Sequence, residues 1–244
     1  SVFLVKFLYG LTRFSANCLR RLPKGAISCI IMLIYFSEAK PLYPILKRML
    51  DFLLALLALL LLSPLLLILA AAVRLTSPGP ALFTQRRVGL HRKLFTIYKF
   101  RTMRTDTPKD APTHLLQDAN RFITPLGRFL RASSLDELPQ LINILRGDMA
   151  FVGPRPALWN QDDLIAARER VGANDVRPGL TGWAQINGRD ELPIPVKARL
   201  DGEYVQKMSF GFDLMCFFGT FLSVLRRDGV REGAPAPEEE KKDA

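Results

Sequence analysis

An Asp-Glu pair, Asp136 and Glu137, stands in the segment Ser-Ser-Leu-Asp-Glu-Leu-Pro at residues 133–139. A carboxylate at the start of a helix is held ionised by the helix dipole and by free backbone N–H groups. An ionised Asp136 could act as a nucleophile, as carboxylates do in aspartyl-phosphate chemistry. Glu137 could bind a divalent cation through a hard oxygen ligand. The same residues also suit a capping box between Ser134 and Glu137, so a catalytic and a structural interpretation both stay open on this motif alone.

Residues that could bind phosphate lie in three other segments. Lys99 and Arg101 fall on one face of an expected strand, and two neighbouring cations repel unless an anion lies between them. Arg155 stands between two prolines, which limits its backbone freedom and lowers the entropic cost of binding a phosphate. Taken singly, each segment could equally be an ordinary strand, turn or packed loop. The third segment, glycine-rich and without a Walker A or dinucleotide-binding pattern, has the candidate ligands Arg177, Gln185 and Arg189.

Cysteine and histidine content argues against a zinc site or a disulfide framework. The three cysteines (Cys18, Cys29 and Cys216) form no C-x-x-C pair, and the two histidines are far apart in the sequence. Reduced thiols facing the cytosol are the simplest interpretation of this pattern.

One long apolar segment precedes these groups in the chain and is long enough to enter a membrane. Residues Leu50–Val73 contain thirteen leucines and no charge after Asp51, and about 20 apolar residues suffice to cross the hydrocarbon of a bilayer. Pro64 near the middle removes one helical hydrogen bond and predicts a kink. The hydroxyl of Ser63 could help to satisfy the freed backbone group.

Basic residues on both sides of this segment bear on its topology. Positive residues favour the cytoplasmic side of a membrane, so the least strained arrangement keeps both ends there. We therefore expect residues 47–74 to form a re-entrant membrane helix broken at Ser63-Pro64, in preference to a spanning helix or a buried core helix. The flanking cations are Lys47 and Arg48 before the segment, and Arg74, Arg86, Arg87, Arg92 and Lys93 after it.

The remainder of the chain predicts a small, mainly helical α+β domain over residues 75–228. Ala81–Gln85 and Leu94–Phe100 read as strands of a β-hairpin around a basic turn at residues 86–93. Apolar periodicity predicts several helices, and the glycine- and proline-rich stretch 176–195 predicts a loop. Residues 212–227 could be a core helix or a helix in the membrane interface. The helices are expected at residues 126–131, 138–145, 157–171, 200–207 and 212–227.

Both ends of the chain are harder to assign. Residues 1–46 form a basic and apolar extension of unclear role, too short in its apolar run to span comfortably and only faintly like a signal peptide. Residues 229–244 lack apolar anchors and are expected to be disordered. The net charge is +11, and its positive part is concentrated in the first 135 residues. This charge indicates anionic partners, namely a membrane surface, phosphates or nucleic acid.

Together these segments resemble the bacterial sugar transferase family, the monotopic polyprenyl-phosphate phosphoglycosyl transferases. The resemblance covers roughly three quarters of the chain, with every segment in the same order as in the family. The matching segments are Lys47–Phe52, Ser63-Pro64, Phe83–Gly89, Ile97–Met103, Ser134–Gln140, Gly147–Pro156 and Arg177–Arg189.

The resemblance implies an activity and roles for the residues. Family members move a phosphosugar from a nucleotide sugar, usually a UDP-sugar, to undecaprenyl phosphate. By resemblance, Asp136 attacks the β-phosphate and forms a covalent phosphosugar intermediate, while Glu137 helps to bind Mg²⁺. Such a transferase lies at the bacterial cytoplasmic membrane with its catalytic domain on the cytoplasmic face, where membrane lipids are partners and a homodimer is possible. The expected phosphate clamps are Lys99, Arg101, Arg131 and Arg155.

Two other classes of function compete with this interpretation. A non-catalytic membrane-surface adaptor of the polysaccharide assembly machinery would explain the basic and apolar segments, but the intact Asp-Glu pair speaks against it. A nucleic-acid-binding protein would explain the positive charge but not the leucine-rich segment, and the sequence has no DNA- or RNA-binding motif.

Overall fold

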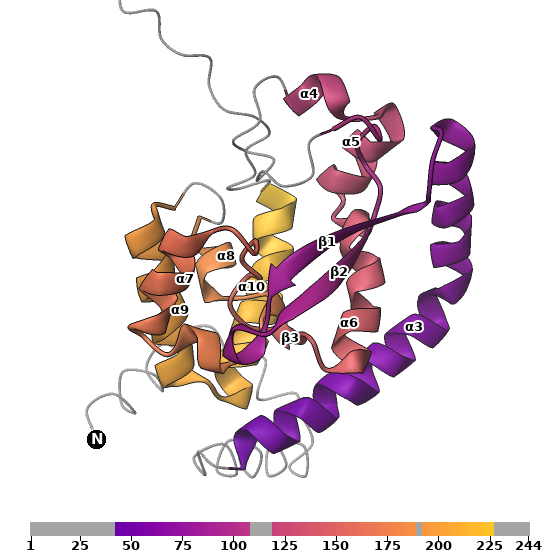
Figure 1. The fold of residues 1–244 in the computed structure, drawn as a ribbon. Coiled ribbons are helices and arrows are strands. Elements are labelled where there is room, and N and C mark those ends of the chain that lie inside the picture. Colours follow the sequence, from indigo (N-terminus) through magenta and orange to yellow (C-terminus); the bar gives the residue numbers. More distant parts are fainter. Residues whose placement is uncertain (1–41, 108–118, 189–191, 227–244) are drawn as a thin grey trace, which may run out of the picture.

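The computed structural model describes residues 42–107, 119–188 and 192–226, and over these residues it is a mainly helical α+β structure with two small sheets (Figure 1). The expected fold class is confirmed at this level. Residues 1–41 of the extension expected at 1–46, and the tail expected at 229–244, lie outside the described residues, while residues 43–46 are the start of helix α3 (Tyr43–Thr76). The helices are α3 (Tyr43–Thr76), α4 (Ala119–Phe122), α5 (Pro125–Ala132), α6 (Leu141–Arg146), α7 (Asp162–Glu169), α8 (Trp183–Ile186), α9 (Ile194–Lys207) and α10 (Phe210–Arg226). The 3₁₀ turns are η1 (Leu90–Arg92), η3 (Leu135–Gln140) and η4 (Ala173–Asp175), and the strands are β1 (Leu82–Val88), β2 (Leu94–Phe100), β3 (Ala150–Val152) and β4 (Gly179–Thr181).

The long apolar helix α3 bends around one side of the globular part (Figure 1). It is a single helix of 34 residues with Pro64 inside it, so the expected break is a bend in a continuous helix. Pro64 has no N–H, which leaves the carbonyl of Leu60, four residues earlier, without its helical donor. The hydroxyl of Ser63 donates to that carbonyl at 2.9 Å. The bend therefore leaves no unsatisfied acceptor at this position, as the sequence predicted.

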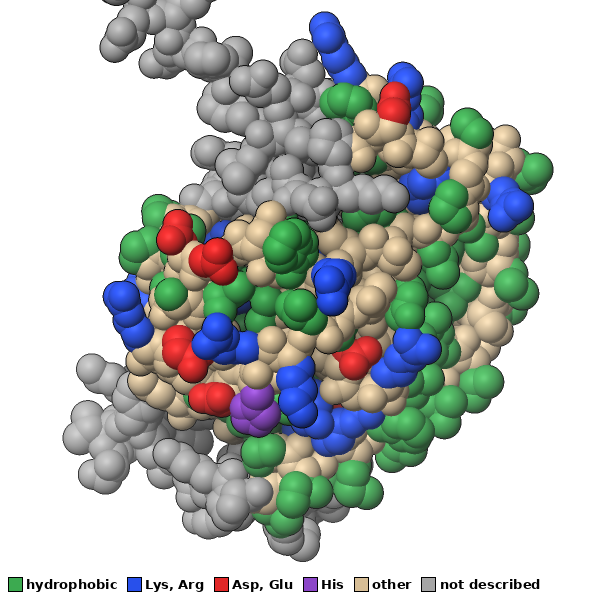
Figure 2. Space-filling model, in the orientation of Figure 1, with side chains coloured by type: hydrophobic (Ala, Val, Ile, Leu, Met, Phe, Trp, Pro, Cys, Tyr) green, Lys and Arg blue, Asp and Glu red, His purple; other side chains and the backbone are tan. Residues whose placement is uncertain are grey.

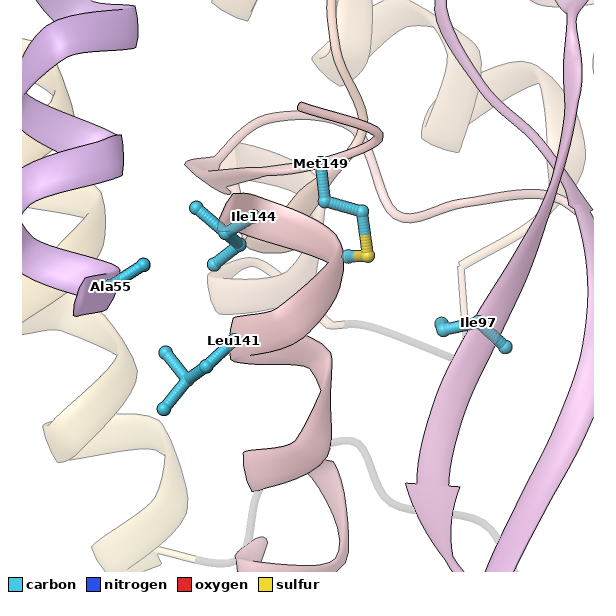
Figure 3. Packing of buried hydrophobic residues seen from close by; sticks show 5 residues of the cluster. All are labelled: Ala55, Ile97, Leu141, Ile144 and Met149. Atoms are coloured by element: carbon cyan, nitrogen blue, oxygen red, sulfur yellow. The ribbon is translucent and has the colours of Figure 1, made fainter. Parts of the chain in front are cut away.

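The inner face of α3 forms part of the hydrophobic core. Ala55 of α3 points toward Leu141 and Ile144 of α6, with Met149 and Ile97 of β2 completing the same cluster (Figure 3). Ala55, Ile144 and Met149 are fully buried, so a larger side chain at Ala55 would force α3 away from α6. A second cluster joins the other half of the helix to β2 and α5 through Leu69, Val73, Phe100 and Leu130.

A buried polar network, which we call the α3 anchor, fastens the first turns of α3 to the C-terminal part of the domain. Asp213 of α10 accepts hydrogen bonds from Tyr43 at 2.7 Å, from Tyr204 at 2.9 Å and from Lys47 in close contact. Lys47 also lies 3.6 Å from Asp51, and Asp51 accepts from the Phe151 amide at 3.3 Å. Every member of this network is therefore paired within the protein.

Arg48 binds α3 to α6. Its guanidinium donates to the carbonyls of Ile144 at 2.6 Å and Leu145 at 2.8 Å. Both carbonyls lie in the last turn of α6, where the helix dipole favours a cation, and the Ile144 carbonyl also accepts from the Gly147 amide at 3.1 Å. Lys47 and Arg48, which the charge pattern assigned to the membrane flank, are thus bound by groups of the protein.

The β-hairpin is confirmed, with a shorter turn than expected. Strands β1 and β2 pair antiparallel from Leu82 opposite Phe100 to Val88 opposite Leu94, so the first strand continues through Arg86 and Arg87. On one side the hairpin packs against η3 and α6.

Residues 138–188 depart most from expectation. The helix expected at 138–145 is divided between η3 and α6, with Pro139 inside the 3₁₀ part. Of the helix expected at 157–171, only Asp162–Glu169 is helical, as α7. Leu158 instead forms a β-bridge with Arg87. The loop expected at 176–195 contains β4 and α8, and β4 pairs parallel with β3. This pair is tight: a Cβ on Gly179 would lie 2.1 Å from the Gly153 nitrogen.

Helix α10 combines the two alternatives left open for it. Cys216 is fully buried against Val152 and Tyr204, and Phe212 lies 5.1 Å from the Trp183 ring. Phe218 is 61% exposed on another face of the same helix. One face of α10 is therefore core, and the other presents apolar side chains outward.

Candidate active site

The Asp-Glu pair begins the 3₁₀ turn η3, directly after a backbone reversal at Ser134. Ser134 has φ of 57°, in the left-handed region, and its side chain makes no capping hydrogen bond. Asp136 and Glu137 are both buried, at 9% exposure. The capping-box interpretation is therefore wrong, because Glu137 is directed to a lysine of the hairpin instead of the helix N-terminus.

Cations from three separate elements surround this pair. Lys99 of β2 donates to Glu137 Oε1 at 2.7 Å, and the Arg155 guanidinium, in the loop after β3, lies 3.4 Å from the same oxygen. Arg131 of α5 donates from Nε to Thr102 Oγ1 at 2.9 Å, and its charge acts on Asp136. The structure thus brings Lys99, Arg131 and Arg155 together at the pair. Their role as phosphate ligands stays a prediction.

Burial and charge act in opposite directions on these groups. Burial raises the pKa of Asp136 above its ordinary value and the neighbouring Glu137 raises it further, while Lys99, Arg131 and Arg155 oppose the shift. Burial likewise lowers the pKa of Lys99, opposed first by Glu137. Desolvation is thus the largest influence on the pKa of Asp136, and it favours the neutral carboxyl. A phosphate entering the site would meet three cations in a partly dehydrated setting.

Arg101 lies elsewhere. Its guanidinium donates to the backbone carbonyls of Ser77, Pro78 and Pro80, at 2.9 Å for Ser77 and 2.7 Å for Pro80, and the residue is 5% exposed. In this structure Arg101 fixes the turn between α3 and β1. Its assignment as a phosphate ligand stays a prediction.

The described candidates of the glycine-rich segment, Arg177 and Gln185, bind backbone carbonyls away from the pair. Arg177 Nε donates to the Gly147 carbonyl at 2.9 Å, just beyond α6. Gln185 donates to the Leu180 carbonyl at 3.3 Å, and its buried Oε1 has no partner among the described residues. Arg189 lies outside the described residues. Substrate contacts of Arg177, Gln185 and Arg189 therefore stay predictions.

The donor set bears on the expected Mg²⁺. Within residues 42–107, 119–188 and 192–226, no three His, Cys, Asp or Glu side chains gather closely enough to hold a metal ion. Mg²⁺ nevertheless needs few protein ligands, because it commonly takes one or two carboxylates together with substrate phosphates and waters. The two adjacent carboxylates Asp136 and Glu137 fit that mode, and they do not fit an all-protein metal cage.

Comparison with known proteins accounts for this arrangement. A family model described as "Bacterial sugar transferase" matches residues 42–227, which is most of the chain. The chain belongs to the bacterial sugar transferase family.

Relatives within this family differ in length. The chain is 44% identical over 188 residues to the uncharacterized sugar transferase EpsL of Bacillus subtilis, covering 77% of this chain and 91% of EpsL. It is 45% identical over 193 residues to the UDP-glucose:undecaprenyl-phosphate glucose-1-phosphate transferase of Caulobacter vibrioides, covering 75% and 71%. The protein with the same description in Escherichia coli K12 is 42% identical over 183 residues, covering 72% of this chain and 39% of that protein.

Two buried polar residues beside the site have no signal in the sequence pattern. Asn143 is fully buried, accepts from the Tyr98 amide at 3.1 Å and donates to the Thr96 carbonyl at 2.7 Å, so α6 holds the strand that carries Lys99. Gln140, at the end of η3, is 2% exposed, and its Nε2 has no hydrogen-bond partner in the described part of the chain. A lone asparagine in a helical pattern gives no sequence signal for the role that Asn143 has in holding β2.

Proposed function

We propose that this chain transfers a sugar 1-phosphate from a UDP-sugar to undecaprenyl phosphate, releasing UMP, in the first membrane step of polysaccharide or glycoconjugate assembly. The observation that carries this proposal is the buried Asp136–Glu137 pair surrounded by Lys99, Arg131 and Arg155. The names of the Caulobacter and E. coli relatives specify this reaction with UDP-glucose.

The proposed mechanism has two displacements at one phosphorus. In the first, the Asp136 carboxylate attacks the β-phosphorus of the UDP-sugar, and the bond to the bridging oxygen breaks as UMP leaves with the electron pair. In the second, an oxygen of undecaprenyl phosphate attacks the aspartyl-phosphosugar, and the carboxylate leaves. Phosphoryl transfer depends chiefly on positioning and charge neutralisation, which Lys99, Arg131 and Arg155 supply.

Mg²⁺ fits this proposal as a partner of Glu137 and of the substrate diphosphate. When bound, it neutralises phosphate charge and assists departure of the nucleotide. The contacts of Lys99 and Arg155 with Glu137 hold that carboxylate beside Asp136 and compensate its charge.

Release of UMP is the test of the proposed activity. Purified protein in detergent would be mixed with undecaprenyl phosphate and a panel of UDP-sugars, and UMP would be measured for each sugar. We expect release with at least one member of the panel, together with a lipid-linked product. An adaptor without chemistry would give no UMP with any sugar. The panel also addresses the sugar itself, because names of relatives specify glucose, galactose and N-acetylgalactosamine.

The proposal extends to the membrane. Helix α3 is long and apolar enough to cross a membrane, and only 11% of its most apolar 18-residue window is buried within the protein. Its outward leucines form the apolar right-hand edge of the molecule (Figure 2). We propose that the bend at Pro64 makes α3 re-entrant, with the catalytic domain on the cytoplasmic face of the bacterial inner membrane.

Sidedness of the two ends of α3 is a direct prediction of that topology. The three native cysteines would first be replaced by alanine. A single cysteine would then be introduced at Ile45, which is 62% exposed, or at Leu75, which is 85% exposed. A membrane-impermeant maleimide added outside sealed inverted vesicles, which expose the cytoplasmic face, should label both positions. The same reagent added outside right-side-out vesicles should label neither position. Labelling from opposite sides would show a spanning helix and refute the re-entrant arrangement.

The pH profile of UMP release should have two limbs with assigned causes. Asp136 must be ionised to attack, and its pKa is raised by burial, so activity should fall on acidification at a pH above the ordinary range of an aspartate. Lys99 must be protonated to neutralise charge, and burial lowers its pKa, so activity should fall at a pH below the ordinary range of a lysine.

The Lys99→Arg variant tests the alkaline limb. Arginine stays protonated throughout the accessible range, so this limb should move to higher pH while the acid limb keeps its place. An unchanged alkaline limb would show that another group controls it.

A further inference from the structure

The backbone carbonyls of the loop that carries Arg155 are hydrogen-bonded by donors from other segments of the protein. Four consecutive carbonyls, those of residues 154–157, each accept a hydrogen bond from a different donor. The donors are the Gly179 amide to Pro154 at 2.8 Å, the Arg168 guanidinium to Arg155 at 2.8 Å, the Arg87 guanidinium to Pro156 at 3.0 Å and the Val88 amide to Ala157 at 2.9 Å.

Arg168 is unusual among these donors because it is a buried charge. Its side chain is 5% exposed and that of its partner Asp201 is 1% exposed. Asp201 Oδ2 accepts from Arg168 at 2.8 Å through Nε and lies 2.7 Å from its NH2 nitrogen. The pair joins α7 to α9. The NH1 nitrogen of the guanidinium is directed to the carbonyl of Arg155.

Such a pair is poorly explained by stability alone. A buried ion pair often contributes no more stability than apolar residues of similar volume, because both charges must be dehydrated. A guanidinium held by a carboxylate does, however, have a fixed orientation, and it can fix whatever else it binds. Here that group is the backbone of the residue whose side chain lies 3.4 Å from Glu137.

We propose that Arg168 and Asp201 are positioning residues that hold Arg155 against the catalytic pair. This inference rests on the proposed transferase function, since the reaction is where the placement of Arg155 matters. Both residues act at a distance from Asp136 and Glu137, since Arg168 binds Asp201 and the Arg155 carbonyl. Asp201 orients Arg168, Arg168 fixes the Arg155 backbone, and Arg155 meets the site.

The test uses the full-length protein with the double substitution Arg168→Gln/Asp201→Asn. This variant removes both buried charges together, so no unpaired charge is left to unfold the domain. Glutamine cannot reproduce the guanidinium fork, and the contact with the Arg155 carbonyl should be lost. We expect kcat for UMP release to fall about 10- to 100-fold, with KM for the UDP-sugar changed by less than about threefold. Arg170→Gln, on an exposed arginine two residues away, should leave both constants unchanged.

A second background separates positioning from general damage. When Arg155 is already alanine, Arg168→Gln/Asp201→Asn should change kcat by less than about twofold, because the pair would have nothing left to position. An equal fold-loss of kcat in both backgrounds would overturn the proposal.

Hydrogen exchange gives a readout that does not need activity. The backbone amides of Gly153, Arg155, Ala157 and Leu158 should exchange at least about tenfold faster in the double variant than in wild type or Arg170→Gln. Unchanged exchange there would also overturn the proposal. If wild type releases no UMP from any UDP-sugar, the proposed function fails, and the exchange measurement alone decides whether the pair fixes this loop.

Discussion

Replacement of Asp136 by asparagine should lower the rate of UMP release by at least about 10³-fold. Asparagine has nearly the same shape but carries no charge, so it cannot supply the electron pair that attacks the β-phosphorus. The cations around it, Lys99, Arg131 and Arg155, stay in place. Binding of the nucleotide sugar should therefore persist while the chemical step is lost.

Trapping the intermediate makes this prediction specific for a covalent mechanism. Wild type incubated with its UDP-sugar and no lipid acceptor should gain the mass of one phosphosugar, and peptide mapping should place the adduct on Asp136. The Asp136→Asn variant should gain no mass.

The matched control is Asp162→Asn, which removes an exposed aspartate from the first turn of α7. It should keep wild-type activity and form the adduct. Substantial transfer by Asp136→Asn would refute the covalent mechanism.

Replacement of Lys47 by methionine should destabilise the protein by about 3–5 kcal/mol. Methionine fills a similar volume, but it leaves the buried Asp51 and Asp213 without the cation that lies between them. An uncompensated buried charge is among the costliest single changes in a folded protein. Urea unfolding in detergent, followed by tryptophan fluorescence, would measure the change in the free energy of unfolding.

The control for Lys47→Met is the same substitution at a surface ion pair. Lys207 is 43% exposed and lies 3.7 Å from Glu203, so Lys207→Met should cost no more than about 1 kcal/mol. Similar losses for the two variants would show that the α3 anchor contributes nothing beyond an ordinary surface pair.

Local pattern was sufficient for much of this fold. The hairpin, α5 and α10 follow from apolar periodicity and turn residues. The kink in α3 follows from a proline in a leucine-rich segment. Lys99 and Arg155 are indicated by strand alternation and by flanking prolines, whereas Arg131 is indicated only by the resemblance to a known family. The hydroxyl of Ser63 also binds the carbonyl that Pro64 leaves free.

Pairing between distant residues was beyond such patterns. Strands β3 and β4 are three residues each, too short to show a period of two, so the segment containing β4 reads as loop. The Asp136–Glu137 segment matches a capping box in spacing, and only the three-dimensional position of Lys99 decides against it.

The charge pattern around α3 also did not show which groups bind Lys47 and Arg48, because those groups are distant in the sequence. Lys47 and Arg48 beside an apolar segment are typical of residues at a membrane surface. A sequence does not reveal that α6 ends next to Arg48 or that Asp213 reaches Lys47. Basic residues at the start of a membrane helix can therefore serve the protein as much as the lipid.

The α3 anchor joins residues that are synthesised far apart in time. Lys47 leaves the ribosome 166 residues before Asp213, and bacterial elongation at about 5–20 residues per second makes that interval roughly 8–30 s. Throughout it, a leucine-rich helix is available to the insertion machinery while its partner on α10 does not yet exist. For the membrane-inserted α3 proposed above, insertion and docking onto α10 are therefore separable events, and docking waits until Asp213 has been translated.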